Sequence, residues 1–340
     1  MHDPKDRWVS FGWHVIEIDG HNQEEIENAF NEAREVKTKP VMIIANTVKG
    51  KGVSFMENQY LWHSRIPTDD ELNQAKKELE MGAIDGDLAN STKLDTVANG
   101  NPKKFLQMGI AEQNMMSVAA GLATTGLQPW ACTFAAFLSK RAIDQIQVQI
   151  AQPKLDVKMI GAYSGLLTGV TGKTHQALED IAIFRSLANM VVLAPADAIE
   201  MKQMMEFAHK YEGPVYIRIA RDPYPVIVDG KYQFEFGKAA TLKDGKDVTI
   251  ISTGTQTSRS LVAAEQLEAE GISVAVVHMP TIKPLDTDAI IKAAECTGVI
   301  VTAEEHSIYG GLGSAVAEVL VEECPVPMLR VGVKDVNSES

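Results

Sequence analysis

The amino-acid sequence predicts an α/β fold in which mainly parallel sheets are flanked by helices. Short apolar segments such as VMIIANT (41–47) and VKMIGAY (157–163) alternate with helix-period segments such as EEIENAFNEAREV (24–36) almost throughout. This alternation is typical of βαβ units whose strands are covered on both faces. With 340 residues, 45% hydrophobic and 23% charged, the chain is long enough for two or three domains.

The first predicted domain covers residues 1–80. The strand WHVIEID (13–19), the helix at 24–36 and the strand at 41–47 make one predicted βαβ unit. A charged helix, TDDELNQAKKELE (68–80), then runs into MGAIDGDLANST, and this change of composition marks the predicted boundary.

The second predicted domain covers residues 81–228. It ends in a series of alternating strands and helices: VKMIGAY, HQALEDIAIFRSLA, MVVLAP, IEMKQMMEFAHKY and VYIRI. Earlier in this domain, Glu112 opens the nearly uncharged segment AEQNMMSVAAGLATTG (111–126), which predicts a buried helix. A carboxylate in such a place costs several kcal/mol unless something partners it.

The third predicted domain covers residues 229–340, including a linker. The passage DPYPVIVDGKYQFEFGKAATLKDGKD (222–247) contains proline and glycine and predicts a linker with a short hairpin. A new strand and helix series follows: VTIIST, SLVAAEQLEAEG, SVAVVHM, DTDAIIKAAECTG, VIVTAEE, SAVAEVLVEEC and PMLRVGV. We therefore expect a separate C-terminal α/β domain.

The composition narrows the classes of partner. A formal net charge of −13 argues against nucleic acid or an anionic membrane, because neither is attracted to such a field. The three cysteines are widely spaced, which fits a reducing compartment without a disulfide framework. The first residues, MHDPKDRW, are charged and unlike a signal peptide, and no segment is apolar enough to span a bilayer. We expect a cytoplasmic protein.

Several common site motifs are missing from the sequence. GGLG (310–313) and STGTQT (252–257) do not complete a G-x-G-x-x-G pattern, and no C-x-x-C, G-x-S-x-G or helical histidine pair occurs. Polar and aromatic residues instead gather at predicted strand ends and helix starts, where ligands bind open parallel sheets. These candidates are DGDLANS (85–91), Glu112, Phe134, Phe137, His175 in GKTHQALED, Arg221 in IRIARDP, and WHS (62–64).

In this order, these segments resemble the transketolase family of thiamine-diphosphate enzymes over essentially the whole chain. FGWHVIEIDGHNQEEI and PVMIIANTVKGKGVSFME are similar to the end of the family's diphosphate-binding domain. GDLANSTK, FLQMGIAEQNMMSVAAGLATTG, TFAAFLSKRAIDQI and GKTHQALEDIAIFRSLANMVVLAPADA are similar to its pyrimidine-binding domain. TAEEHSIYGGLGSAVAE is similar to its C-terminal domain. The resemblance implies thiamine-diphosphate-binding folds followed by a C-terminal α/β domain.

The resemblance also implies roles in cofactor binding. The acid matching Glu112 hydrogen-bonds a ring nitrogen of the aminopyrimidine and favours its imino tautomer, whereas position alone allows Glu112 merely to complement a helix dipole. Phe134 and Phe137 lie three residues apart, so they face the same side of a helix start. They are either two core aromatics or, by the resemblance, the slot that holds the pyrimidine. Asp87 is expected to reach the cofactor or a dimer partner.

Further residues are implied to contact the substrate. His63 and His175 match histidines that line the donor-sugar channel and assist proton transfer, a task that suits imidazole. Alternatively, they are a surface-loop histidine and a helix-start histidine. Ser91 and Arg221 fall where the family contacts a terminal phosphate, although Arg221 could equally pair with Asp222.

The sequence departs from the family pattern in three places. The G-D-G motif that holds the diphosphate through Mg²⁺ or Ca²⁺ is missing, so the metal ligands are unknown. The helix that ordinarily opens the pyrimidine domain and the usual final helix are missing too, as in joined pieces of a longer, split-gene or compacted transketolase. Tyr163 and Thr171 replace a histidine and an aspartate of the donor loop, which predicts an altered substrate preference.

The resemblance implies an enzyme that passes a two-carbon glycolaldehyde unit from a ketose or ketose phosphate to an aldose through the carbanion of thiamine diphosphate. It implies a homodimer or a heterotetramer with the active site at a subunit interface. Two alternatives stay open. One is a relative that decarboxylates a 2-keto acid such as hydroxypyruvate or pyruvate. The other is a subunit whose site a partner chain completes.

Overall fold

A computed structural model describes residues 4–48, 56, 58–59, 82–100, 102–228 and 232–336. The chain divides into two compact units, Met1–Glu80 and Met81–Ser340. No helix within the described residues is both long and apolar enough to cross a bilayer.

The first unit contains the predicted βαβ arrangement. Its elements are α1 (Pro4–Ser10), β1 (His14–Asp19), α2 (Gln23–Glu35) and β2 (Val41–Asn46). The two strands are parallel, with His14 opposite Val41 and Asp19 opposite Asn46. Ile16 and Ala29 are buried, whereas Phe30 is 55% exposed, so this unit covers little apolar surface by itself.

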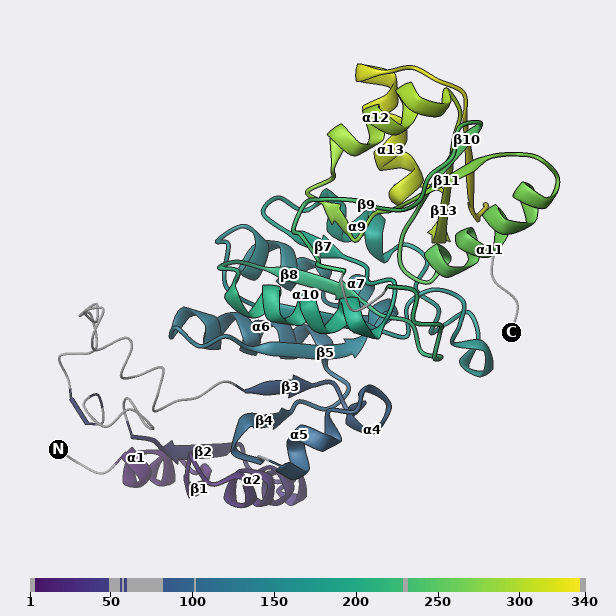
Figure 1. Cartoon of the computed structure of the whole chain (residues 1–340). Helices are drawn as coiled ribbons and strands as arrows, with labels where there is room; N and C mark the ends of the chain where they lie inside the picture. Colours follow the sequence, from purple (N-terminus) through teal and green to yellow (C-terminus); the bar gives the residue numbers. More distant parts are fainter. Residues whose placement is uncertain are drawn as a thin grey trace. The chain divides into compact units, whose positions relative to one another are not determined.

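The second unit contains two sheets (Figure 1). The larger sheet has seven strands in the order β12-β7-β8-β6-β5-β3-β4. Their bounds are β3 (Ala83–Asp85), β4 (Phe105–Gln107), β5 (Trp130–Phe134), β6 (Lys158–Ala162), β7 (Val191–Leu193), β8 (Val215–Arg218) and β12 (Thr281–Lys283). All neighbouring strands are parallel except β12, which is antiparallel to β7.

Helices cover the seven-stranded sheet. They are α4 (Ala89–Thr92), α5 (Asp95–Gly100), α6 (Glu112–Thr124), α7 (Ala135–Arg141), α8 (Ile143–Gln145), α9 (Asp180–Ser186) and α10 (Ala198–Lys210). Two 3-10 turns, η2 (Pro102–Lys104) and η4 (Gly169–Thr171), and a π-helix, η3 (Ile146–Ala151), complete the helical elements that the structure describes here. Ile84 of β3, Met115 of α6 and Leu138 of α7 meet in one fully buried core. The predicted buried helix after Glu112 is confirmed.

The smaller sheet has five strands in the order β14-β13-β10-β11-β9. Its strands are β9 (Ala240–Lys243), β10 (Val248–Ser252), β11 (Val274–His278), β13 (Ile300–Ser307) and β14 (Met328–Val333). Its helices are α11 (Gln256–Ala269), α12 (Thr287–Thr297) and α13 (Leu312–Glu323). Strand β9 alone in this sheet, as far as the described residues show, pairs antiparallel.

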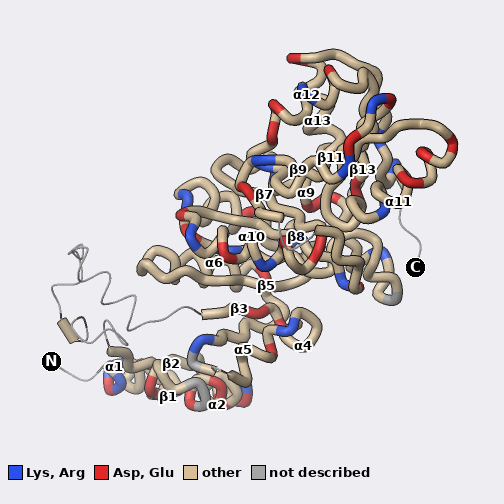
Figure 2. Tube along the Cα trace, viewed as in Figure 1, with Lys and Arg blue, Asp and Glu red and all other residues tan. Residues whose placement is uncertain are grey.

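The central strands have the composition of buried parallel strands. The sequences of β5, β7, β10 and β11 contain no Asp, Glu, Lys or Arg, and the strand labelled β5 is tan in Figure 2. The charged residues of this unit lie mostly in helices and loops. The predicted α/β class with mainly parallel sheets is confirmed.

Two local predictions were wrong. Helix α9 begins at Asp180, so His175 lies in the preceding loop and not in a helix. The helix begins late because the carbonyls of Ala177 and Leu178 accept hydrogen bonds from Gly165 and Ser307 instead. The short hairpin predicted within residues 222–247 was the second wrong prediction. Strand β9, from that segment, pairs with β11 and not with another strand of the linker.

Candidate active site

A pocket of about 290 Å³ lies at the carboxyl ends of the central strands of the larger sheet, the position at which open parallel sheets bind ligands. Its walls come from the turn after β3, the start of α6, helix α7 and the loop that precedes α9. The lining residues are Gly86, Leu88, Ile110, Glu112, Phe137, Arg141, Thr174 and His175. The structure therefore brings together three of the predicted site residues, Glu112, Phe137 and His175.

Glu112 is the first residue of α6 and is only 3% exposed. Nη1 of Arg141 donates to both of its carboxylate oxygens, at 3.0 and 3.2 Å. The guanidinium also lies 3.9 Å from the centre of the Phe137 ring, within the range of a cation–π contact. The buried carboxylate of Glu112 thus has a cationic partner in the same chain.

Arg141 was missed by the sequence analysis. It stands four residues after Phe137 on α7, a spacing that places both side chains on one face of a helix. That spacing could have indicated that Arg141 lies beside Phe137. It could not have indicated the pairing with Glu112, which is 29 residues away in the chain.

Phe134 and Phe137 lie at the start of α7 on one side, as predicted, with ring centres 5.7 Å apart. Phe134 is buried, and its ring stacks on Tyr163 at 4.0 Å. The imidazole of His175 meets both phenylalanines edge-on, at 5.9 and 5.1 Å. We call Phe134, Phe137, Tyr163 and His175 the aromatic cluster.

Tyr163 adopts a left-handed backbone conformation, with φ of 57°. This conformation costs an ordinary side chain about 1 kcal/mol or more, and such residues concentrate at functional sites. The stacking on Phe134 holds the ring in place, and the guanidinium of Arg221 lies 5.6 Å from its centre. Tyr163 is therefore built into the wall beside the pocket.

His175 reaches the aromatic cluster from the loop before α9. Its Nδ1 lies 2.9 Å from the hydroxyl of Thr174, and its backbone N–H donates to the carbonyl of Gly172. The next residue, Gln176, donates to the carbonyl of Leu166. The imidazole is thus held by the loop that bears it, residues 163–175, and by the two phenylalanine rings that it contacts.

Family models match residues 1–226 and 237–340 of the chain. The transketolase thiamine diphosphate binding domain matches residues 1–103, the transketolase pyrimidine binding domain matches residues 72–226, and the transketolase C-terminal domain matches residues 237–340. A transketolase family protein of Sinorhizobium fredii is 45% identical, over 77% of this chain and 76% of its own length. The chain belongs to the transketolase family.

Two further relatives are described as parts of transketolases. The 6-deoxy-6-sulfo-D-fructose transketolase subunit SqwH of Clostridium sp. (strain MSTE9) is 40% identical, over 78% of this chain and 82% of its own length. A solved structure described as a split gene transketolase, inactive beta4 tetramer, is 47% identical with a TM-score of 0.71. That comparison covers 79% of this chain and 87% of the solved one.

The remaining predicted site residues of this transketolase family member lie outside the lining of the pocket, as far as the described residues define it. Asp87 is exposed, with φ of 68°, and its N–H donates to Gln107. The hydroxyl of Ser91 donates to Asn90 at 3.3 Å. Arg221 is exposed and pairs with Asp222 at 3.4 Å, which is the alternative that the sequence allowed. His63 lies outside the described residues.

Asp85 is a second residue that the sequence analysis did not single out within DGDLANS. It is fully buried at the end of β3, where Oδ2 accepts hydrogen bonds from Leu88 N and Gln107 Nε2. Oδ1 has no hydrogen-bond partner within the described part of the chain. Because Gly86 and Leu88 line the pocket, Asp85 fixes the turn that forms one of its walls.

The metal ligands stay unknown. No group of three or more His, Cys, Asp or Glu side chains with the spacing of a metal site occurs among residues 4–48, 56, 58–59, 82–100, 102–228 and 232–336. All three cysteines, Cys132, Cys296 and Cys324, are free thiols. Burial raises the pKa of the Cys132 thiol to about 12, so this cysteine is protonated and unreactive at neutral pH.

Proposed function

We propose that this chain is a subunit of a thiamine-diphosphate-dependent transketolase that transfers a two-carbon unit from a ketose or ketose phosphate to an aldose. The observation that carries the proposal is the pocket in which a buried carboxylate, Glu112, shares the lining with Phe137 and His175. An acid, an apolar ring and an imidazole suit an aminopyrimidine, which has apolar faces and a polar edge. We also propose that the protein acts in the cytoplasm, because its three cysteines are free thiols.

The residues of the pocket fit the pyrimidine end of the cofactor. Glu112 would hold a proton between its carboxylate and a ring nitrogen, and Phe134 and Phe137 would lie against the ring. The two hydrogen bonds from Arg141 use one lone pair on each carboxylate oxygen, which leaves each oxygen able to accept another donor. When bound, thiamine diphosphate supplies the carbanion chemistry, while the protein positions and desolvates it.

We propose that a partner chain completes the diphosphate end of the site. The diphosphate needs oxygen ligands around Mg²⁺ or Ca²⁺, and the G-D-G motif that the resemblance implies for this task does not occur in the sequence. Support comes from the relative described as a transketolase subunit and from the solved relative described as a split gene transketolase. We propose a heterotetramer with the site at the subunit interface. A homodimer is the alternative assembly.

The sugar contacts belong to the same proposal. His175 and His63 would bind donor hydroxyl groups, and Ser91 and Arg221 would bind a terminal phosphate. A guanidinium pairs with a phosphate through two parallel hydrogen bonds, and the exposed Arg221 has only one ion pair, with Asp222, among the described contacts. Asp87, in the turn after β3, would reach the cofactor or the partner subunit.

The first test is a calorimetric titration of the full chain with thiamine diphosphate and Mg²⁺, with and without a separately produced transketolase diphosphate-domain chain. The same samples are assayed with glycolaldehyde and one of three donors: hydroxypyruvate, pyruvate or a ketose phosphate. We expect saturable binding and turnover of the ketose phosphate once the partner chain is present. Turnover of pyruvate instead would favour a 2-keto-acid-decarboxylating relative.

The matched variant is Glu112→Gln, which keeps the shape of the side chain and removes its charge. It should lower turnover at least about a hundredfold, since proton transfer by a positioned group contributes that much. Absence of cofactor binding both with and without the partner chain would overturn the proposal.

A further inference from the structure

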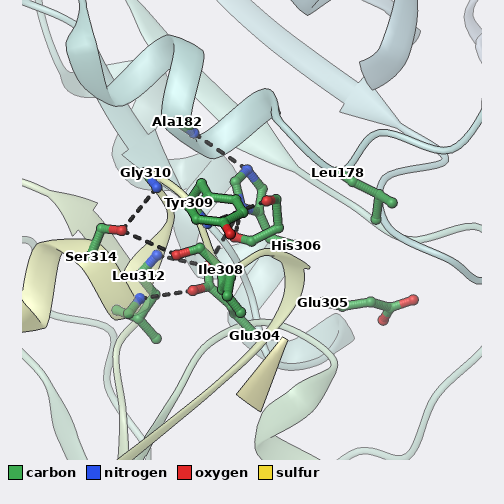
Figure 3. Close-up of polar contacts among 12 residues, drawn as sticks. Leu178, Ala182, Glu304, Glu305, His306, Ile308, Tyr309, Gly310, Leu312 and Ser314 are labelled. Atoms are coloured by element: carbon green, nitrogen blue, oxygen red, sulfur yellow. Dashed lines mark hydrogen bonds and ion pairs between the residues drawn. The ribbon is translucent and has the colours of Figure 1, made fainter. Parts of the chain in front are cut away.

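Near its end, strand β13 carries Glu304, Glu305 and His306, and the two carboxylates have different partners. Successive side chains of a strand point to opposite faces of its sheet. Glu304 and His306 therefore lie on one face and Glu305 on the other, and Figure 3 shows Glu305 turned away from the other two. All three side chains are at most 3% exposed.

Glu304 acts within the C-terminal domain. Its carboxylate accepts hydrogen bonds from the N–H groups of Leu312 and Gly313 at 2.7 and 2.8 Å (Figure 3). These are the first two residues of α13, so Glu304 satisfies donors that a helix start leaves unpaired. His306 Nδ1 lies 3.7 Å from Glu304, and its Nε2 accepts from the N–H of Ala182.

Glu305 reaches out of the C-terminal domain to the loop that bears His175. Oε1 accepts hydrogen bonds from the backbone N–H groups of Leu166 and Leu167 at 2.7 and 3.1 Å. Oε2 accepts from the hydroxyl of Thr255 at 2.5 Å. The carboxylate thus links loop 163–175 to the residue that precedes α11.

The loop is shaped to receive this carboxylate. Gly165 has φ of +76°, and a Cβ there would lie 2.8 Å from Cδ of Glu305, so no larger residue fits without displacing it. Ala177, two residues beyond the loop, is linked to Glu305 through Arg218. Arg218 Nη2 donates to the carbonyls of both Ala177 and Glu305, at 3.3 and 2.6 Å.

We propose that Glu305 is a positioning residue: from the C-terminal domain, it holds loop 163–175 so that Tyr163 stays stacked on Phe134 and His175 faces the pocket. The role in catalysis rests on the proposed function, whereas the effect on the loop does not. A buried carboxylate that accepts two backbone N–H groups forms charge-assisted hydrogen bonds, which are stronger than neutral ones. The C-terminal domain, which contributes no residue to the pocket lining among the described residues, thereby acts on the site.

The test compares Glu305→Gln with Glu304→Gln in the full chain. Both remove one buried carboxylate charge from neighbouring positions of one strand, and both carboxylates accept two backbone N–H groups. Amide hydrogen exchange is measured without cofactor. Glu305→Gln should speed exchange at Leu166 and Leu167 about tenfold, the loss expected for a charge-assisted bond. Glu304→Gln should leave those amides unchanged and speed exchange at Leu312 and Gly313.

The functional measurement uses the assembled, cofactor-loaded complex. Glu305→Gln should lower kcat at least about tenfold, because small displacements of positioned groups cost that much, while KM for the ketose changes less than about threefold. Glu304→Gln should lower the thermal midpoint without this fall in kcat. Unchanged exchange at Leu166 and Leu167, or an unchanged kcat, would overturn the inference.

A second variant covers failure of Glu305→Gln to fold. Thr255→Val keeps the volume of the side chain and removes the hydroxyl donor to Oε2. It should speed exchange at Leu166 and Leu167 about threefold, since a neutral donor contributes less than a charged one; no change there would also overturn the inference. A wild-type chain that neither binds cofactor nor turns over, yet shows the exchange pattern, would sink only the proposed function.

Discussion

Arg141 donates to both carboxylate oxygens of Glu112, at 3.0 and 3.2 Å, while its guanidinium lies against the ring of Phe137. The side chain of Glu112 is buried, and that of Arg141 is about half-exposed. The pair keeps the charge of Glu112 compensated at the wall of the pocket. It also places a cation beside the ring that we propose to receive the pyrimidine.

Arg141→Gln should destabilise the protein, because it leaves a buried carboxylate without its cation. We expect the free energy of unfolding to fall by about 1–2 kcal/mol, less than for a fully buried pair because Arg141 is half-exposed. Urea denaturation measures this. Lys140→Gln is the matched control, because Lys140 pairs with Glu179 through side chains that are 47% and 50% exposed. If both variants lost the same free energy of unfolding, the Arg141–Glu112 pair would be no more important for stability than the exposed Lys140–Glu179 pair, and the prediction would be wrong.

The two phenylalanines should differ in what they stabilise. Phe134 is 5% exposed and stacks on Tyr163, so Phe134→Leu should lower the free energy of unfolding by about 1–2 kcal/mol. Phe137 is half-buried and lines the pocket, so Phe137→Leu should weaken cofactor binding about tenfold with a smaller loss of stability. Denaturation measures the stability of both variants, and calorimetry measures their cofactor binding. A larger stability loss from Phe137→Leu than from Phe134→Leu would contradict the prediction.

Asp197 should be a strong stabilising residue. Its carboxylate accepts four backbone hydrogen bonds, from Ile199 and Glu200 at the start of α10 and from Ile227 and Val228 of the linker. Asp197→Ala should cost about 3–4 kcal/mol, because it removes a helix cap and leaves further donors unpaired.

Asp286→Ala is the comparison for Asp197→Ala. It removes a cap from α12 that accepts two backbone hydrogen bonds, from Ala239 and Ala289. Its loss should be about half as large. Thermal or chemical denaturation of both variants measures the ratio, and the idea fails if Asp286→Ala is the more damaging change.

The stability of the protein should fall in strongly alkaline solution. Burial, followed by the charges of Asp197 and Glu200, raises the pKa of Tyr224 from 10.0 to about 12. The folded state therefore keeps the proton after the unfolded chain has lost it. The resulting stabilisation is complete below pH 10 and is lost as the pH rises from 10 to about 12. Tyr224→Phe should make the free energy of unfolding fall less steeply over that range. The control is Tyr309→Phe, at an exposed tyrosine, which should leave the slope unchanged.

Much of the fold followed from local pattern. The apolar strands of both sheets and the helix after Glu112 were predicted correctly because a buried strand or helix needs a continuous or periodic apolar sequence. The start of α9 was not, because backbone groups of Gly165 and Ser307 take the carbonyls that a longer helix would have used. The predicted domain boundaries after residues 80 and 228 stay predictions.

The site was predictable in its residue types but not in its pairings. Glu112, Phe137 and His175 were singled out from the sequence, and the structure places them around one pocket. Arg141 and Glu305 were not, because their partners lie 29 and 139 positions away and only folding brings them together. The roles of Glu112, His175, His63, Phe134, Phe137, Asp87, Ser91 and Arg221 stay predictions until the variants are measured.

Strand β12, from the last third of the chain, forms the edge of the seven-stranded sheet beside β7. During synthesis, β7 is complete about 90 residues before β12 emerges from the ribosome. Its outer edge then exposes unpaired backbone groups, which readily pair with other chains. The growing chain should therefore depend on the arrival of Thr281–Lys283 to close that edge, and a gene cut within the linker would release a protein with the edge left open.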